Sequence, residues 1–373
     1  MKRNLHIDNI RGLLLVIILI DHLELRLSAI TNSPLGYTSA AEGFIFMSGL
    51  VAGIVYMGRA LKTDFKQMSL HAQKRSFTIY QYHIFLYALT LIIFLNSDTI
   101  NQFWKADMPL MAANPLLAFF QGISLLYQPA PNDILPIYCI LLLLLPVVLK
   151  QFVKNKLTLV LAISLALYLL GQFQLVETTI SGLNKTMSTS IDLGYFNILS
   201  WQLLFFLGLL LGTWEVKNYP WWTAFKKNRV IFFVSLSVII PCLVLRHTLY
   251  KNIPYADILI NRSHLAPLRL LNFLSISFVV NYLISRYRPS VSAFLVYLGQ
   301  NSLQVFSFHV IVVLCMAPFV PLIVKTGYLT ELVITALAIL SLWIPAFLNV
   351  LYTKRNQRKK NLQLVSDDLK LAK

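Results

Sequence analysis

The side chains in this sequence that could do chemistry stand inside long apolar runs. An imidazole can take up or release a proton near neutral pH, and His22 directly follows Asp21. A carboxylate can hold an imidazole in one tautomer, and a guanidinium can bind an anion. Because a charge inside a bilayer is costly, each ionisable residue in such a run is a candidate for a functional site. The candidates are Asp21, His22, Glu42, Arg269 and His309.

Arg11 stands eleven residues before His22 in the first apolar run. Eleven residues of helix rise about 16 Å and make three turns plus about 20°, so both side chains lie on one face. Arg11 either binds an anionic ligand or extends to the nearby interface, and the sequence leaves both open. Glu42 and Arg269 also have two readings, since a salt bridge between them could serve packing alone. His309 has a similar alternative, as a hydrogen bond between helices.

The composition indicates that most of the chain does not face water. Of its 373 residues, 57% are hydrophobic and 13% are charged, and the mean hydropathy is +0.67. A soluble domain has about a quarter charged residues. The three cysteines all lie in apolar runs, so neither a disulfide framework nor a metal motif is expected. We therefore predict an all-α, polytopic integral membrane protein, with the lipid bilayer as one of its partners.

A helix needs about 20 apolar residues to cross a bilayer. About ten transmembrane helices are predicted, at Ile10–Ile30, Ser39–Gly58, Ile79–Leu95, Asp133–Phe152, Leu157–Leu175, Phe196–Trp214, Val230–Leu245, Leu265–Ser285, Ala293–Ala317 and Leu329–Tyr352. The shorter apolar stretch Pro115–Tyr127 is expected to be interfacial or re-entrant. Residues 1–353 form a single membrane domain in this prediction, and residues 354–373 form a basic cytoplasmic tail.

Positive charge alternates along the predicted loops. The net charge is +17, and Lys and Arg concentrate in the loops after the second, fourth, sixth and eighth runs and in the tail. Since cytoplasmic loops carry this excess, both termini are predicted to be cytoplasmic. The excess of basic residues is then explained by their position next to the anionic membrane surface, and no nucleic acid is expected as a partner. One outer loop departs from the trend, with Arg246, Lys251 and Arg262.

With this topology, the candidate site residues are predicted to lie at a similar depth in the membrane. Asp21, His22, Glu42, Arg269 and His309 fall in the outer half of four different helices. The prediction is a polar cavity that opens to the outer side, and the alternative is charge pairing that only fixes helix packing. In the second run, Glu42 shares a stripe with a GxxxG motif at residues 49–53, which lets another helix approach closely.

Several short motifs, in register over nearly the whole chain, resemble the OpgC family. They are Ile7-Asp8-Asn9-Ile10-Arg11-Gly12, Asp21-His22, Ala41-Glu42-Gly43-Phe44-Ile45-Phe46-Met47-Ser48-Gly49, Asn132-Asp133-Ile134-Leu135-Pro136-Ile137-Tyr138, Leu268-Arg269-Leu270-Leu271 and Leu298-Gly299-Gln300-Asn301-Ser302-Leu303. The family resembles a wider group of transmembrane acyltransferases with an arginine, ten intervening residues and a histidine in the first helix. Arg11 and His22 match that spacing.

The resemblance implies transfer of an acyl group, typically succinyl, from cytoplasmic acyl-CoA to a hydroxyl of a periplasmic or envelope glycan. His22 would then be the general base, with Asp21 or Glu42 holding its tautomer. Arg11 would meet a phosphate of the donor. Arg269 would bind an acyl carboxylate or the oxyanion. The other residues assigned to substrate binding are His309, Asn301 and Ser302.

This interpretation places the protein in a bacterial inner membrane as a multi-pass enzyme. It has acyl-CoA as a co-substrate and no permanently bound cofactor. The main alternative is a transporter or flippase of a lipid-linked glycan or organic anion, and a third is a non-catalytic partner in an envelope complex. The sequence leaves open the acyl group, the glycan acceptor, the oligomeric state, and whether transfer is direct or passes through an acyl-histidine.

Overall fold

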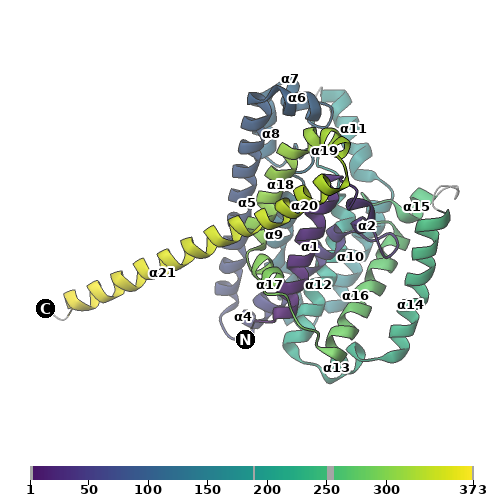
Figure 1. The fold of residues 1–373 in the computed structure, drawn as a ribbon. Coiled ribbons are helices and arrows are strands. Elements are labelled where there is room, and N and C mark those ends of the chain that lie inside the picture. Colours follow the sequence, from purple (N-terminus) through teal and green to yellow (C-terminus); the bar gives the residue numbers. More distant parts are fainter. Residues whose placement is uncertain (1–2, 188–189, 250–255, 372–373) are drawn as a thin grey trace.

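The computed structural model describes residues 3–187, 190–249 and 256–371, and in these ranges the regular elements are helices (Figure 1). Within the described ranges, eight helices are long and apolar enough to cross a membrane, or nine if the bent pair α10 (Leu157–Gln172) and α11 (Leu175–Met187) forms one span. The eight are Ala40–Ala60, Phe65–Asn96, Ile134–Val153, Ile198–Lys217, Arg229–Thr248, Pro267–Tyr287, Ser302–Thr326 and Tyr328–Arg358. The prediction of an all-α polytopic membrane protein is confirmed.

The first helix is shorter than predicted. Helix α1 spans Leu5–Leu23 and is not among the eight, although it lies in the centre of the bundle. It ends because Glu24 adopts a left-handed backbone conformation, with φ of 52°. The chain then turns through the short helix α2 (Ser28–Thr31) instead of continuing to Ile30 as one run. His22 consequently lies in the last turn of α1.

Other boundaries differ as well. Helix α5 (Phe65–Asn96) begins 14 residues before its predicted start. The predicted ninth span is divided at Asn301 into α17 (Ala293–Gln300) and α18 (Ser302–Met316). The stretch predicted as interfacial forms the short helix α8 (Pro115–Ile123). In the tail, α21 (Trp343–Leu371) is continuous across the predicted boundary at residue 353, and it extends away from the bundle (Figure 1).

Two close helix contacts bring the site elements together. Helix α3 (Ala40–Ala52) and the π-helical turn η1 (Gly53–Met57) that continues it pack on α12 (Ile198–Lys217), and each side of this contact has two glycines four residues apart. A Cβ atom on any of the four glycines would come closer than 3.0 Å to the opposite backbone, so the helices could not approach so closely with larger residues. The four are Gly49, Gly53, Gly208 and Gly212. Helices α1 and α17 meet in the same way, at Gly12 and Gly299.

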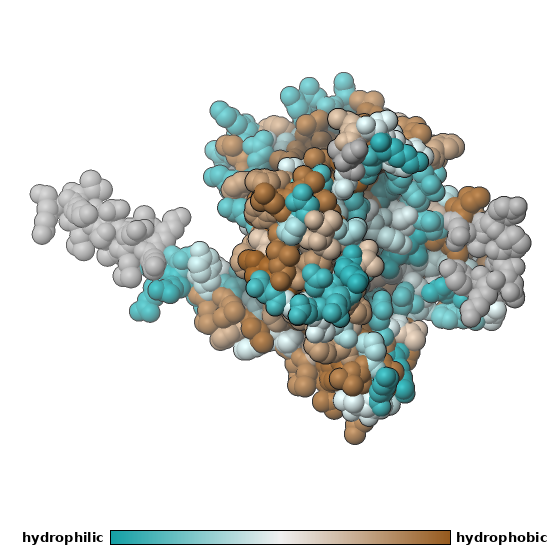
Figure 2. Space-filling view, turned by 90° about the horizontal axis from the view of Figure 1, so that it is seen from above, coloured by the Kyte–Doolittle hydropathy of each residue, from teal (hydrophilic) through white to brown (hydrophobic). Residues whose placement is uncertain are grey.

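Loops that were predicted to share a side of the membrane lie at one end of the bundle. The N-terminus, α4 (Gly58–Ala60) and α13 (Pro220–Lys226) are at the lower end in Figure 1, whereas α7 (Pro109–Ala113) and α11 are at the upper end. The loop before α17 belongs to the lower end too, because the Ser292 amide donates to the Asn9 side chain over 2.8 Å. From above, the upper end shows hydrophilic residues interleaved with hydrophobic ones (Figure 2).

Candidate active site

The centre of the candidate site is a pair of histidines from α1 and α18. The Nδ1 atom of His22 lies 3.3 Å from the Nε2 atom of His309, and the two rings stack with centroids 5.5 Å apart. His309 is buried, with 1% exposure, whereas His22 is only partly buried. The ring of Phe306 packs against His309 at 4.7 Å between centroids, and Phe44 stacks on Phe306 at 5.2 Å. One imidazole therefore remains accessible, and the other is enclosed behind it.

The hydrogen bonds of this pair define the tautomers of both rings in their neutral forms. The Nδ1 atom of His309 lies 2.5 Å from the Phe306 carbonyl oxygen, which can only accept, so this nitrogen carries the proton. The Nε2 atom of His309 must then accept from Nδ1 of His22. This leaves Nε2 of His22 with a free lone pair, as a general base requires.

The two predicted orienting carboxylates contact other groups instead of the His22 ring. Asp21 accepts a 2.5 Å hydrogen bond from the Thr31 hydroxyl. Glu42 is fully buried, and it accepts from the Ser39 amide at 2.9 Å and from the Ser39 hydroxyl at 2.5 Å. Its second oxygen pairs with the Arg269 guanidinium. Among the described residues, the hydrogen-bond partner of the His22 ring is thus a second histidine.

The Arg269 side chain is bound by partners within the protein. Besides Glu42, it donates from Nε to the Ile260 carbonyl over 3.2 Å, and only 8% of its surface is exposed. One turn later, the buried Asn272 accepts from the Tyr37 amide at 2.9 Å. This part of α16 (Pro267–Tyr287) therefore fixes the segment that leads into α3.

Arg11 and Ser302 meet towards the other end of α1. Nη2 of Arg11 donates to the Ser302 hydroxyl, at the first residue of α18, while its Nε is buried without a hydrogen-bond partner among the described residues. The neighbouring Asn301 has structural partners, since it donates to the Tyr297 carbonyl over 2.9 Å and accepts from Asn349 at 2.7 Å. A helix start beside an incompletely satisfied guanidinium is suited to an anion.

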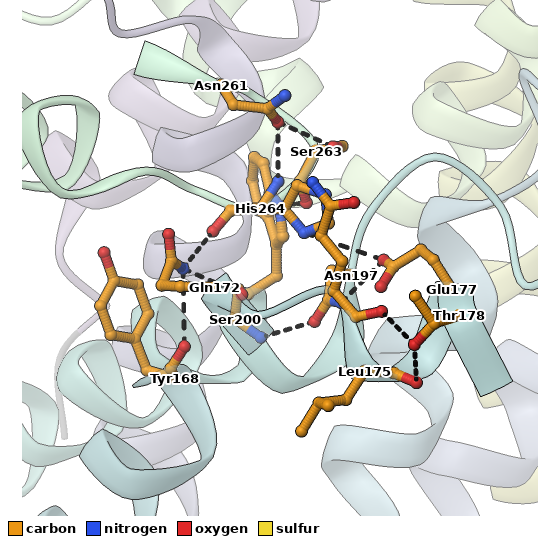
Figure 3. A network of polar contacts seen from close by, with 12 residues as sticks. Tyr168, Gln172, Leu175, Glu177, Thr178, Asn197, Ser200, Asn261, Ser263 and His264 are labelled. Carbon is orange, nitrogen blue, oxygen red and sulfur yellow. Dashed lines mark hydrogen bonds and ion pairs between the residues drawn. The ribbon is translucent and has the colours of Figure 1, made fainter. Parts of the chain in front are cut away.

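The loop between α15 (Ala256–Ile260) and α16 was not predicted to lie near the site. Arg262 in this loop acts electrostatically on Asp21, His22 and Asp133. The one signal for it was the positive charge that departs from the trend of the outer loops. A buried polar network on either side of Arg262 holds the loop against α10 and α12 (Figure 3).

A hollow of about 550 Å³ opens at the upper end, between the start of α9 (Ile134–Val153), α11 and the segment that leads into α12. Its wall includes Glu177, Lys185 and Asn197. It also includes Gln128, which is 2% exposed and whose amide nitrogen and oxygen both lack partners among the described residues. Another wall residue, Gly194, is where an added Cβ would lie 2.7 Å from Cβ of Asp133. This hollow was not predicted, since its polar residues come from three separate segments of the sequence.

The family model OpgC_C, described as OpgC protein, matches residues 3–354. No curated protein and no solved structure matches the chain.

Proposed function

The chain belongs to the OpgC protein family, and from this premise we propose that it is a membrane-embedded O-acyltransferase. The proposed reaction moves an acyl group from cytoplasmic acyl-CoA to a hydroxyl of a periplasmic or envelope glycan. The proposed location is a bacterial inner membrane, with both chain ends in the cytoplasm. The multi-pass helical bundle is consistent with a reaction whose two substrates arrive from opposite sides.

The hydrogen-bonded imidazole pair is the observation that carries this proposal. With Nδ1 of His22 protonated and directed to His309, Nε2 of His22 is free to take the proton of an acceptor hydroxyl. The hydroxyl oxygen forms a bond to the thioester carbonyl carbon, and the carbon–sulfur bond then breaks. The proton held by His22 passes to the leaving thiolate, so the products are an ester and CoA-SH.

The donor is proposed to enter from the end where Arg11 lies. An acyl-CoA carries phosphates at one end and a long pantetheine arm that ends in the thioester. The Arg11 guanidinium and the backbone amides at the start of α18 offer donors to an anionic or strongly polar part of this molecule. The rise along α1 from Arg11 to His22 is about 16 Å. The extended pantetheine arm would span this distance and bring the thioester to His22.

The acceptor is proposed to occupy the 550 Å³ hollow at the opposite end. Sugars present many hydroxyls, and the unpartnered amide of Gln128 can both donate to and accept from them. Carboxylate and amide groups at Glu177 and Asn197 add further partners on the same wall. The hollow shares Ile137 with a much smaller cavity that Phe44 also lines, and Phe44 packs on Phe306, which packs on His309, so a layer of packed side chains connects the wall of the hollow to the histidine pair.

A transfer assay with the full chain tests the proposal. Purified protein in liposomes is supplied with acyl-CoA and a glucan, and mass spectrometry measures the mass added to the glucan. His22→Ala should abolish the added mass while the melting temperature stays close to that of the wild type. His71→Ala, at an exposed histidine of α5, is the matched control and should retain activity.

Two results would count against the proposal. Full activity in His22→Ala would remove the assigned base. Acyl-CoA-independent movement of a glycan across the liposome membrane, without any mass added, would instead support the transporter class.

A further inference from the structure

One corner at the lower end of the bundle carries far more positive than negative charge. The corner is built by the end of α12, by α13, by the start of α14 (Arg229–Val244) and by the end of α16 (Figure 1). Between Glu215 and Asp257, and again between Asp257 and Glu331, the sequence has no aspartate or glutamate. The cations that these elements contribute to the corner are Lys217, Lys226, Lys227, Arg229, Arg286 and Arg288.

The carboxylate that the end of α12 supplies to this corner is already engaged. One oxygen of Glu215 accepts from the Trp222 indole at 2.9 Å and pairs with the Lys226 ammonium at 2.6 Å. Lys217 lies 5.9 Å from the centroid of the Tyr219 ring. The other four cations are exposed, and within the described part of the chain their side chains form no ion pair or hydrogen bond: they are Lys227, Arg229, Arg286 and Arg288.

The packing of α14 on α16 brings two of these guanidiniums to the same place. The two helices are antiparallel, because the end of α14 packs with the start of α16 in one apolar cluster, whereas the rings of Phe232 and Tyr282 meet nearer the lower end, with centroids 4.5 Å apart. Arg229 stands three residues before Phe232, and Arg286 stands four residues after Tyr282. Residues three or four apart share a helix face. Arg229 and Arg286 therefore both lie one turn below this ring contact.

Exposed aromatic rings lie in the same corner. Half of the Trp221 surface is accessible, although its ring is held against Trp214 at 4.8 Å between centroids. Phe225 packs on Phe278 of α16 at 5.3 Å, so α13 is fixed to that helix. Tyr287, which directly follows Arg286, is also exposed. Tryptophan and tyrosine concentrate at the level of lipid headgroups, so these rings indicate where the membrane surface meets the corner.

The surface next to the cations suits acyl chains. Val230, Phe233 and Val234, in the first turns of α14, each have more than half of their surface exposed. Since the segment Arg229–Thr248 is long and apolar enough to cross a membrane, this exposed face is one that contacts lipid. A molecule that fits the whole corner therefore combines negative groups with long hydrocarbon chains.

We propose that this corner binds one anionic phospholipid whose headgroup carries two phosphates, as in cardiolipin. The headgroup lies on Arg229 and Arg286, flanked by Lys227 and Arg288, and the acyl chains follow the exposed face of α14. Guanidinium groups bind phosphate through charge-assisted hydrogen bonds. Basic pockets between transmembrane helices bind such headgroups. Four cations without an acidic partner complement two phosphates better than one. The corner shares no residue with the histidine pair, and the inference stands apart from the proposed reaction.

Lipid binding to the full chain tests this site. The purified protein in detergent is mixed with cardiolipin, phosphatidylglycerol or phosphatidylcholine, and native mass spectrometry measures the affinity for the first bound lipid. The double variant Arg229→Gln/Arg286→Gln removes the two guanidiniums below the ring contact. The matched control is Arg59→Gln/Lys62→Gln, which removes two exposed cations elsewhere at the lower end and so loses the same charge.

The wild type should bind cardiolipin more tightly than phosphatidylglycerol, and phosphatidylglycerol more tightly than phosphatidylcholine. Arg229→Gln/Arg286→Gln should weaken cardiolipin binding by about 30-fold, since each cation beside an anionic lipid contributes about fivefold. Its affinity for phosphatidylcholine should hardly change, because that lipid has no net charge. The control should keep the cardiolipin affinity of the wild type within about threefold, because charges further away are screened by salt.

Three results would overturn the inference. One is equal affinity of the wild type for cardiolipin and phosphatidylcholine. Another is an equal loss in the control and in Arg229→Gln/Arg286→Gln, which would mean a diffuse attraction to the whole basic end. The third is displacement of cardiolipin by inorganic pyrophosphate, which would make a soluble phosphate compound the ligand.

A second double variant keeps the test decisive if the first one fails to fold. Lys227→Gln/Arg288→Gln removes the two flanking cations and leaves the residues next to the ring contact in place. It should also weaken cardiolipin binding by more than the control does. Unchanged cardiolipin affinity in this variant, with a melting temperature close to that of the wild type, would equally overturn the inference.

Discussion

The Nδ1 atom of His22 lies 3.3 Å from Nε2 of His309, although 287 positions separate the two residues. His309 in turn is tied to the Phe306 carbonyl, so the orientation of both rings follows from the backbone of α18. In the proposed mechanism a neutral histidine takes the place that a carboxylate has in many catalytic triads. His309 is then a positioning residue, since it would act through His22.

His309→Phe keeps an aromatic ring at this position and removes the acceptor for Nδ1 of His22. We expect kcat to fall by about 10²-fold, because the His22 proton is then free to move to the other nitrogen. The KM for both substrates should hardly change. His309→Gln can offer an amide oxygen and should recover part of the loss, which a purely structural role would not predict. Equal kcat in the wild type and His309→Phe would contradict the proton arrangement.

Arg11→Ala should weaken binding of acyl-CoA by about tenfold or more, since a charged hydrogen bond to the donor is lost. Calorimetry with CoA and the purified protein in detergent measures the affinity directly. Ser302→Ala is a useful comparison, because it removes the protein acceptor of Arg11 and leaves the guanidinium available. It should bind CoA at least as well as the wild type. Unchanged affinity in Arg11→Ala would remove the role assigned to this residue.

The Glu42–Arg269 pair can be separated into structural and catalytic parts. Loss of one partner, in Glu42→Leu or Arg269→Met, should reduce the free energy of unfolding by about 3–5 kcal/mol, because the other charge is left buried and unpaired. The double variant should cost less than the sum of the two. Denaturant unfolding in detergent provides the three values. If the double variant is stable but inactive, the pair contributes to substrate binding in addition to packing.

The contact between α3 and α12 depends on the absence of side chains. Gly208→Ala places a Cβ closer than 3.0 Å to the Phe46 carbonyl oxygen, so the two helices must separate. We expect a loss of about 1–3 kcal/mol of stability, as for other overpacked sites. Gly182→Ala in α11 is the matched control, because a Cβ there meets nothing within 4 Å. It should be neutral or slightly stabilising, since alanine favours helix. Melting temperatures of the two variants, compared with that of the wild type, test this prediction. An unchanged melting temperature in Gly208→Ala would contradict it.

Much of the bundle could be predicted because apolar runs and loop charges report on membrane spans directly. The sequence also indicated the glycine face of α3 at Gly49. It did not identify the partner, although Gly208 and Gly212 show the same spacing on α12. The early end of α1 was not predicted. It follows from the left-handed backbone conformation of Glu24, which is uncommon for residues other than glycine and cannot be recognised from a glutamate in the sequence.

A shared membrane depth of the candidate residues stays a prediction, whereas their contacts could not be predicted from the sequence. His22 and His309 were both placed in the outer half, yet hydrophobic periodicity does not say which helices are neighbours or which faces meet. The same gap explains why Asp21 and Glu42 were assigned to His22, whereas the structure gives them Thr31 and Arg269 as partners. Arg262 appeared only as an exception in a charge count, because a loop residue carries no periodicity that reveals its direction.

The central place of α1 has a consequence for how the protein is made. A ribosome delivers α1 to the membrane long before α17 and α18, which pack against that helix and lie nearly 300 residues later in the chain. Until then its polar side chains lack their final neighbours, so a nascent or truncated chain has neither the histidine pair nor the Arg11–Ser302 contact. Catalytic competence would therefore arise in one late step of biogenesis, and prematurely terminated translation products would be inert in the cell.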